Sequence, residues 1–479
     1  MTAALVTTKF GQLQGVQEGR VFAWRGVPYA KPPLGNLRFR PPQAPEPWEG
    51  IKEAQQFAPR AMQPLLWSQE AAPEGYSEDC LYLNIWSPAA DHKKRPVMVW
   101  IHGGFFTVGS GSDPRFNGTA MAELNDVVLV TMNYRLGPFG FLQLRQIGGE
   151  DYAASGNCGM LDQVAALTWV KENIAAFGGD PDNVTIFGQS AGGRSVGLLL
   201  SMPSAKGLFQ KAIIHSGGIQ TIGTADNAAK LAEVMLHKLN ISKDNLSELH
   251  EITAEAILEA APMPHAGNGM EPNIDGEFLP NMPLEAVAAG DAIHIPIMAG
   301  YTLNDFTRTF DPSWERMSED EILQYFQKKI GSVWDDVSPL YLEQKGDDVL
   351  EKLIQLLIRN EFAMPATRLV ELQAGHGTAA WLFRYDYPDP KSGLATHGSE
   401  LPYIFNTAED SDGHVMAVQM YTTWAAFARN GNPNNKEIPD WPAYDLKRRP
   451  TMLLSRDSRL EYDLDREIRI AWDKAKQQA

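Results

Sequence analysis

The chain has 479 residues, of which 44% are hydrophobic and 21% charged, as is usual for a globular protein with a large core. Acidic residues outnumber basic ones by 59 to 42, which gives a net charge of −17 at pH 7. A surface this acidic repels phosphate backbones and anionic lipids, so nucleic acid and membrane partners are disfavoured.

The compartment is predicted from the cysteines and the N-terminal residues. Cys80 and Cys158 are the only cysteines, so a disulfide framework is excluded and an intracellular protein is favoured. Residues 1–9 lack the basic start and long apolar stretch of a signal peptide, and no apolar run approaches the ~20 residues of a membrane span. We therefore expect a cytoplasmic protein.

The chain changes character after its first ninety residues. Those residues are rich in proline and turn signals, and we expect them to lie over a surface rather than build the centre of a sheet. Near-continuous apolar runs then alternate with segments of helical spacing, such as 160–177. The runs, which are typical of strands buried on both faces, are 97–101, 127–132, 183–187 and 211–214, with further strands expected at 296–299 and 380–385.

This alternation predicts an α/β fold with a large, mostly parallel central sheet flanked by helices. A last helix is expected from about 414 to 429, before the helix-end signal Asn430-Gly-Asn-Pro433. No linker separates independent domains. Helical stretches near 225–290 and 310–375 are therefore interpreted as insertions that cap a single catalytic domain covering residues 1–479.

Gly188-Gln-Ser-Ala-Gly192 has the G-x-S-x-G pattern of a nucleophile elbow. A predicted strand precedes it and a helix rich in small residues follows, which is the context that a strained turn presenting the Ser190 hydroxyl requires. The N–H of Ala191 would face the oxyanion. The alternative, a chance match in a loop rich in glycine and serine, is disfavoured by this context and by His102-Gly-Gly-Phe-Phe106, which resembles an upstream oxyanion segment.

A serine nucleophile needs a histidine base, which follows the acid in the chain order of such enzymes. His376, His397 and His414 lie in the final third of the sequence. His376 would stand at the entry of a strand and His414 at the start of a helix. His397 follows a strand's exit, where ligand-facing loops lie, and is the best candidate.

The acid should follow a strand that ends between the nucleophile and the base. The run at 296–299 leads into Tyr301-Thr-Leu-Asn-Asp305, which makes Asp305 the natural choice, with an exposed loop carboxylate as the alternative. Glu400 is too close in sequence to His397 to be an obvious partner.

Several long segments resemble the type-B carboxylesterases, which include bacterial para-nitrobenzyl-type esterases, liver carboxylesterases and cholinesterases. The resemblance extends over nearly the whole chain and is closest to the bacterial esterases. The matching segments are residues 25–35, Glu78-Asp-Cys-Leu-Tyr-Leu-Asn-Ile-Trp-Ser-Pro88, 133–140, 156–163 and Phe177-Gly-Gly-Asp-Pro-Asp-Asn-Val-Thr-Ile-Phe-Gly-Gln-Ser-Ala-Gly192.

The resemblance implies the α/β-hydrolase fold and a Ser-His-Asp triad of Ser190, His397 and Asp305. It also implies that Gly104, Phe105 and Ala191 donate to the oxyanion. The implied reaction is hydrolysis of carboxylic esters of short to medium acyl chains, through an acyl-enzyme intermediate and without metal or cofactor. The expected partner is a small-molecule ester, and the sequence leaves the oligomeric state open.

Four positions depart from the family pattern. Asp305 stands where most members have glutamate, and Phe105 where they have glycine or alanine, so the pocket is expected to be narrower. Gln189 replaces a common glutamate beside the serine. The usual partner of Cys80 is absent, since Ala61-Met-Gln-Pro64 occupies that region, so a free buried thiol is expected.

Two rival functions remain open. The first is a catalytically silent binding protein, against which the presence of serine, histidine and carboxylate at the three positions argues. The second is an amidase or carbamate hydrolase that uses the same site.

Overall fold

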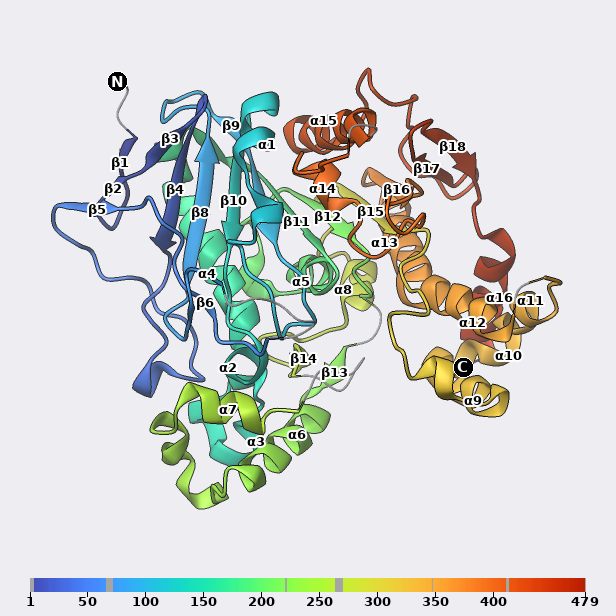
Figure 1. The fold of residues 1–479 in the computed structure, drawn as a ribbon, viewed down its shortest axis with the longest axis horizontal. Helices are drawn as coiled ribbons and strands as arrows, with labels where there is room; N and C mark the ends of the chain where they lie inside the picture. Colours follow the sequence, from blue (N-terminus) through green and yellow to red (C-terminus); the bar gives the residue numbers. More distant parts are fainter. Residues whose placement is uncertain are drawn as a thin grey trace.

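The computed structural model describes residues 4–65, 72–219, 222–262, 270–346, 348–410 and 413–478. Its centre is an eleven-stranded sheet in the order β18-β17-β16-β15-β12-β11-β9-β10-β8-β4-β3 (Figure 1). These strands are β3 (Val16–Glu18), β4 (Val21–Pro28), β8 (Tyr82–Ser87), β9 (Arg95–Ile101), β10 (Val128–Met132), β11 (Gly179–Gln189), β12 (Lys211–His215), β15 (Ile297–Thr302), β16 (Ala380–Tyr385), β17 (Pro450–Leu454) and β18 (Arg459–Tyr462).

Neighbouring strands run parallel from β17 to β10, and antiparallel strands complete the sheet at both ends. All six predicted strands are present. The strand at 380–385 has the predicted bounds, and the other five begin or end at slightly different residues. The expectation for the first ninety residues is wrong in part, because β3, β4 and β8 extend one end of the sheet. Their apolar runs, Val21-Phe-Ala-Trp24 and Leu83-Asn-Ile-Trp86, are buried despite the many prolines around them.

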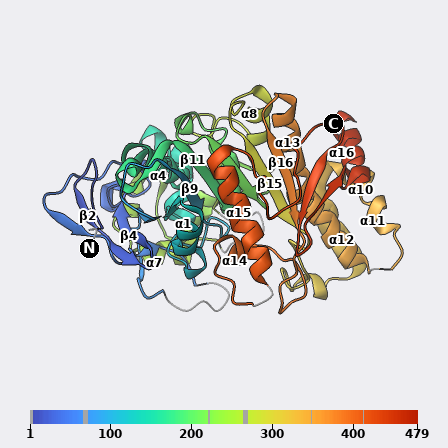
Figure 2. The same ribbon diagram turned by 90° about the horizontal axis from the view of Figure 1, so that it is seen from above.

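Helices cover both faces of the sheet. The α-helices of the described residues are α1 (Thr119–Asn125), α2 (Gly137–Phe141), α3 (Arg145–Gly148), α4 (Cys158–Asn173), α5 (Ala191–Leu199), α6 (Ala225–Lys238), α7 (Ala254–Ala260), α8 (Pro283–Ala289), α9 (Glu319–Ile330), α10 (Trp334–Val337), α11 (Pro339–Leu342), α12 (Val349–Ile358), α13 (Met364–Gly375), α14 (Leu401–Ile404), α15 (His414–Asn430) and α16 (Arg466–Gln478). Among these, α15 runs across β9 and β11 (Figure 2).

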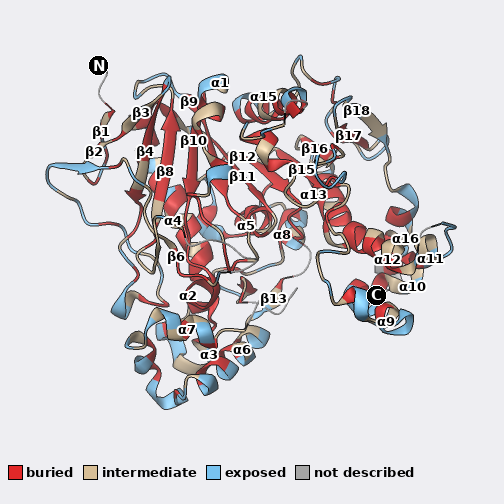
Figure 3. Ribbon diagram, in the orientation of Figure 1, coloured by how far each residue is buried: buried red, intermediate tan, exposed pale blue. Residues whose placement is uncertain are grey.

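Alternate residues of each central strand enter different hydrophobic clusters. In β9, Val97, Val99 and Ile101 belong to a cluster that also contains residues of α4, α5 and α13, whereas Met98 and Trp100 belong to a second cluster with residues of α1, α14 and α15. A strand covered on both faces in this way has no polar alternation, which explains the continuous apolar runs. Figure 3 shows the buried strands at the centre and exposed outer faces on α6, α7 and α9.

Two groups of helices lie away from the sheet. One contains α3, α6 and α7, and the other contains α9 to α12 with α16 (Figure 1). The second group has its own hydrophobic cluster, built around Phe326, Leu353, Ile354 and Trp472. A π-helical turn, Arg359–Ala363, joins α12 to α13, which packs on β15 and β16. No helix in the described ranges is both long and apolar enough to cross a membrane.

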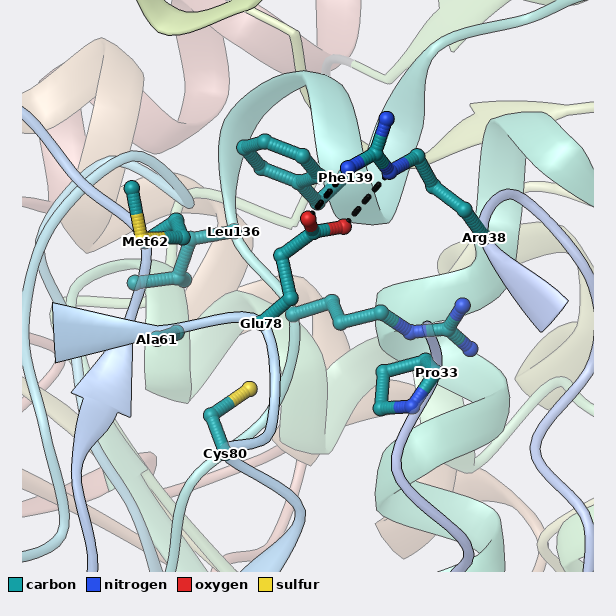
Figure 4. Close-up of a pocket in the computed structure, with 9 residues that line it drawn as sticks. Pro33, Arg38, Ala61, Met62, Glu78, Cys80, Leu136 and Phe139 are labelled. Carbon is teal, nitrogen blue, oxygen red and sulfur yellow. Dashed lines mark hydrogen bonds and ion pairs between the residues drawn. The ribbon is translucent and has the colours of Figure 1, made fainter. Parts of the chain in front are cut away.

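Cys80 is a free, buried thiol, as predicted. Figure 4 shows it beside Ala61 and Met62 in a small pocket, next to the ion pair of Arg38 with Glu78. Burial raises the pKa of the Cys80 thiol well above its ordinary value, so the thiol stays protonated and inert.

Candidate active site

Ser190 stands at a sharp turn between β11 and α5. Its φ of 58° and ψ of −125° lie in a region that L-residues rarely adopt, as expected for a strained elbow. The turn depends on its two glycines: a Cβ on Gly188 would lie 2.5 Å from the carbonyl carbon of Gly192, and one on Gly192 would lie 2.0 Å from Ile101 O. The backbone N–H of Ser190 donates to His215 O at 3.0 Å, which fixes the elbow to the end of β12.

The predicted oxyanion segment follows β9 and passes directly beside the elbow. A Cβ on Gly103 would lie 3.0 Å from Ser190 Cβ, so only glycine allows this approach. Gly104, Phe105 and Phe106 all have positive φ values, of 115°, 57° and 57°. This conformation turns the backbone sharply within three residues, next to the N-terminus of α5, where Ala191 lies.

His102 anchors this segment. Its Nδ1 donates to Gly103 O at 2.9 Å, and its own carbonyl accepts a hydrogen bond from the Tyr134 hydroxyl at 2.9 Å. Burial lowers the pKa of His102 to about 4, so the ring is neutral at physiological pH. We conclude that the neutral His102 ring stabilises the loop through its hydrogen bonds.

Asp305 and His397 are brought together by two loops that leave adjacent parallel strands, β15 and β16. Asn304 N donates to Ala395 O at 2.9 Å, and Ala395 N donates to Asn304 Oδ1 at 3.2 Å, so the loops are joined just before the two side chains. His397 Nδ1 then donates to Asp305 Oδ1 at 2.7 Å. This distance is that of a strong, charge-assisted hydrogen bond, and the shorter acid reaches the imidazole without a gap.

The charge of Asp305 is held by three donors. Besides His397, the backbone N–H of Thr302 donates to Oδ2 at 2.9 Å and the Ser216 hydroxyl donates to the same oxygen at 3.0 Å. The carboxylate is buried, so these bonds replace the water that it lost. An exposed loop carboxylate, the alternative considered from the sequence, does not describe Asp305.

The pKa of His397 is raised above its ordinary value of 6.5. Burial opposes the charged form, but the hydrogen bond and charge of Asp305 and the charge of Glu400 outweigh it. The ring is thus a stronger base than a free imidazole and stabilises a proton taken from a neighbour.

The other two candidate histidines lie elsewhere. His376 follows α13 at the entry side of β16, and its Nε2 donates to Val287 O at 2.9 Å. His414 is exposed at the first position of α15. Of the three candidates, the histidine in the loop after a strand's carboxyl end is therefore the one that contacts Asp305.

Sequence reasoning missed His215 and Ser216, although they directly follow the strand predicted at 211–214. Between them they contact all three loops: His215 O accepts from Ser190 N, the Ser216 hydroxyl donates to Asp305, and His215 Nδ1 lies 3.4 Å from Glu400 Oε1, three residues after His397. Ser216 has a φ of 44°, an unusual value that marks the tight turn. Their position at the carboxyl end of β12 was the feature of the sequence that could have identified them.

Ser190 and His397 line one cavity of about 460 Å³. Its walls are rich in aromatic rings, and it also holds the ion pair of Arg194 with Glu271, 2.8 Å apart. The aromatic side chains that line it are Phe105, Phe106, Phe306, Phe310, Trp314, Tyr325 and Phe362. A hydroxyl and an imidazole at one end of an apolar cavity suit acyl transfer to and from a small organic substrate.

Residues 2–470 match the carboxylesterase family. The chain is 38% identical to para-nitrobenzyl esterase of Bacillus subtilis over 98% of both proteins, and 35% identical to liver carboxylesterase 1 of Oryctolagus cuniculus over 92% of this chain and 87% of that protein. A crystal structure of a Geobacillus stearothermophilus carboxylesterase, 41% identical, superposes with a TM-score of 0.92 over 98% of this chain and all of that one.

These matches confirm the predicted α/β-hydrolase fold and the resemblance to type-B carboxylesterases. They cover nearly all of the sheet and the helices on it. The protein belongs to the carboxylesterase family and is a hydrolase of carboxylic esters.

Proposed function

We propose that Ser190 is the nucleophile of this esterase, His397 its general base and Asp305 the acid that orients the base. The observation that carries this proposal is that Ser190 and His397 line one cavity while His397 Nδ1 donates to a buried carboxylate. With Nδ1 protonated, Nε2 is the nitrogen that accepts the serine proton.

The reaction follows from these positions in two steps. The Ser190 oxygen attacks the ester carbonyl while its proton moves to His397 Nε2, and Asp305 stabilises the imidazolium. The backbone N–H groups of Gly104, Phe105 and Ala191 stabilise the oxyanion, each donor contributing ~2.7–4 kcal/mol. The imidazolium protonates the leaving alcohol, and water then cleaves the acyl-enzyme by the same route.

The substrate is an ester of a short to medium acyl chain. A cavity of about 460 Å³ holds a small organic molecule, and its aromatic walls favour apolar groups. The compartment that we propose is the cytoplasm, supported by two buried cysteines that remain free thiols.

The test is covalent labelling. Purified protein treated with a fluorophosphonate should lose esterase activity and gain one adduct, which peptide mass spectrometry should place on Ser190. An adduct on another residue, or inhibition without an adduct, would reject the assignment of the nucleophile. Parallel assays of an ester and its matched amide report whether amide hydrolysis also occurs.

A further inference from the structure

The active-site cavity has a charged wall that the mechanism above does not use. Arg194 and Glu271 line the same cavity as Ser190 and His397, and Arg194 Nη1 donates to Glu271 Oε2 at 2.8 Å. The Arg194 side chain is 22% exposed, so a molecule in the cavity can reach it. An ion pair among aromatic rings loses much of its hydration, which costs free energy. A guanidinium kept in such a cavity therefore calls for a functional explanation.

The place of the guanidinium relative to the reacting groups follows from three contacts. Arg194 lies in the first turn of α5, and its backbone N–H donates to Ser190 O at 2.8 Å. A Cβ on Gly218 would lie 3.4 Å from Arg194 Nη2 and 3.7 Å from Phe362 Cε1. The Phe362 ring in turn lies 5.5 Å from the imidazole ring of His397, centre to centre. Phe362 is thus near both the guanidinium and the imidazole, within the length of a small ester.

The ion pair leaves part of the guanidinium available to a ligand. An arginine carries five N–H donors and stays charged at physiological pH. Within the described ranges, Glu271 is the only acceptor of a hydrogen bond from this side chain and its only ion-pair partner, and it engages Nη1. The donors on Nη2 and Nε remain, and a planar pair of N–H groups matches the two oxygens of a carboxylate.

The carboxylates of the cavity favour a cationic ligand less than Arg194 favours an anionic one. Glu271 is already paired with the guanidinium. Burial raises the pKa of Glu361, which also lines the cavity, although the charges of Arg194 and Lys329 favour its ionised form. One carboxylate is therefore compensated and the charge of the other is disfavoured, whereas the charge of Arg194 is permanent.

We propose that Arg194 forms an anion subsite in this cavity, and that the enzyme prefers esters that carry a carboxylate away from the scissile bond, in the acyl part or in the alcohol part. The proposal rests on the role assigned above to Ser190 and His397. The aromatic rings contact the apolar body of the ester, and the remaining N–H groups of Arg194 bind the carboxylate. Glu271 holds the guanidinium in position. Monoesters of dicarboxylic acids and acylated hydroxy acids have this chemistry.

The test compares two pairs of esters, each an anion with its neutral amide. The para-nitrophenyl monoesters of adipate and adipamide place the group in the acyl part, and the acetates of para-hydroxybenzoate and para-hydroxybenzamide place it in the alcohol part. The measured quantity is the selectivity ratio, kcat/KM of the anion over that of the amide. Arg194→Gln should lower this ratio about tenfold or more in at least one pair, because hydrogen bonds to a charged group are lost. Unchanged ratios in both pairs would overturn the proposal.

Glu271→Gln gives a change of opposite sign. It removes the charge that competes with the ligand for Arg194 and keeps the shape of the side chain, so the selectivity ratio should rise about threefold or more. If the ion pair only held the two segments together, neither variant would move the ratio. A ratio that stays the same or falls in Glu271→Gln would contradict the subsite. This variant carries the test if Arg194→Gln does not fold.

The matched control is Arg25→Gln. Arg25 on β4 pairs with Glu18, their side chains are about as exposed as those of Arg194 and Glu271, and they are not among the residues that line the cavity. The control should lower the melting temperature and leave both ratios unchanged.

Binding to Ser190→Ala separates this proposal from the proposed function. Calorimetry with the adipate and hydroxybenzoate esters should show binding in Ser190→Ala that weakens about tenfold when Arg194→Gln is added. A lack of fluorophosphonate labelling in the wild type would reject the nucleophile, whereas equal affinities in the single and double variants would reject the anion subsite.

Discussion

Asn304 and Thr396 form a parallel β-bridge between the loop after β15 and the loop after β16. Each residue immediately precedes a member of the proposed acid–base pair, Asp305 or His397. The bridge therefore continues the sheet's parallel pairing beyond the strands and sets the distance between the two side chains. With the loops held this close, the aspartate side chain is long enough to bring Oδ1 within 2.7 Å of His397 Nδ1.

Replacement of Ser190 by alanine should abolish turnover without unfolding the protein. We expect kcat to fall by roughly 10⁶-fold, the scale found when such a nucleophile is removed. Turnover of a nitrophenyl ester and the circular dichroism melting curve measure the two properties. Activity within tenfold of the wild type would mean that another group attacks the ester.

Asp305→Asn should retain the fold and lose most of the activity, by up to ~10⁴ in kcat, because an amide cannot hold His397 in the required tautomer. The matched control is Asp386→Asn, since Asp386 also follows a strand end but pairs with Arg384. Steady-state kinetics of the two variants decide the point. Near-normal turnover in Asp305→Asn would mean that another carboxylate orients His397.

Ser216→Ala should weaken the hold on Asp305. The lost hydrogen bond is to a charged group, a kind that contributes ~1.5–3 kcal/mol, so we expect kcat to fall about tenfold or more with little change in KM. Ser201→Ala is the control, because that buried hydroxyl donates only to the backbone carbonyl of Leu198. Equal kinetics in both variants would show that the hydrogen bond from Ser216 to Asp305 does not contribute to catalysis.

Phe105→Gly should widen the cavity on the oxyanion side. The Phe105 ring lies 6.3 Å from that of Phe310, and its backbone has a φ of 57°, which glycine adopts without strain. We expect esters of branched alcohols to gain in kcat/KM relative to ethyl esters. Phe105→Leu, which keeps the bulk, should show no such gain.

The pH dependence of kcat/KM should follow His397. Its neutral form is the base and its pKa is raised, so activity should be lost as the pH falls through a value above 6.5. In Asp305→Asn the residual activity should have its acid limb at lower pH. A wild-type limb well below 6.5 would mean that burial, and not the neighbouring carboxylates, dominates the protonation of His397.

The sequence indicates the proposed reacting groups more clearly than the residues that hold them. Ser190, His397 and Asp305 could be proposed from the sequence because each follows a buried apolar run, and such runs are visible as one-dimensional patterns. Ser216 and His215 also end such a run, but a serine and a histidine there have no pattern of their own, and their contacts join loops far apart in the chain. The strands β4 and β8 were missed because the prolines around them are a stronger local signal than their short apolar runs.

The cavity draws its walls from two sources with different constraints. Ser190 and Ala191 stand at the end of a strand locked into the main sheet, whereas Trp314, Tyr325 and Leu357 belong to helices whose apolar side chains form a separate cluster. Substitutions in that cluster change the shape of the cavity around the ester while Ser190 and Ala191 keep their positions. Selectivity and bond cleavage are thus separable traits of this enzyme, and variation among its relatives can accumulate in one without loss of the other.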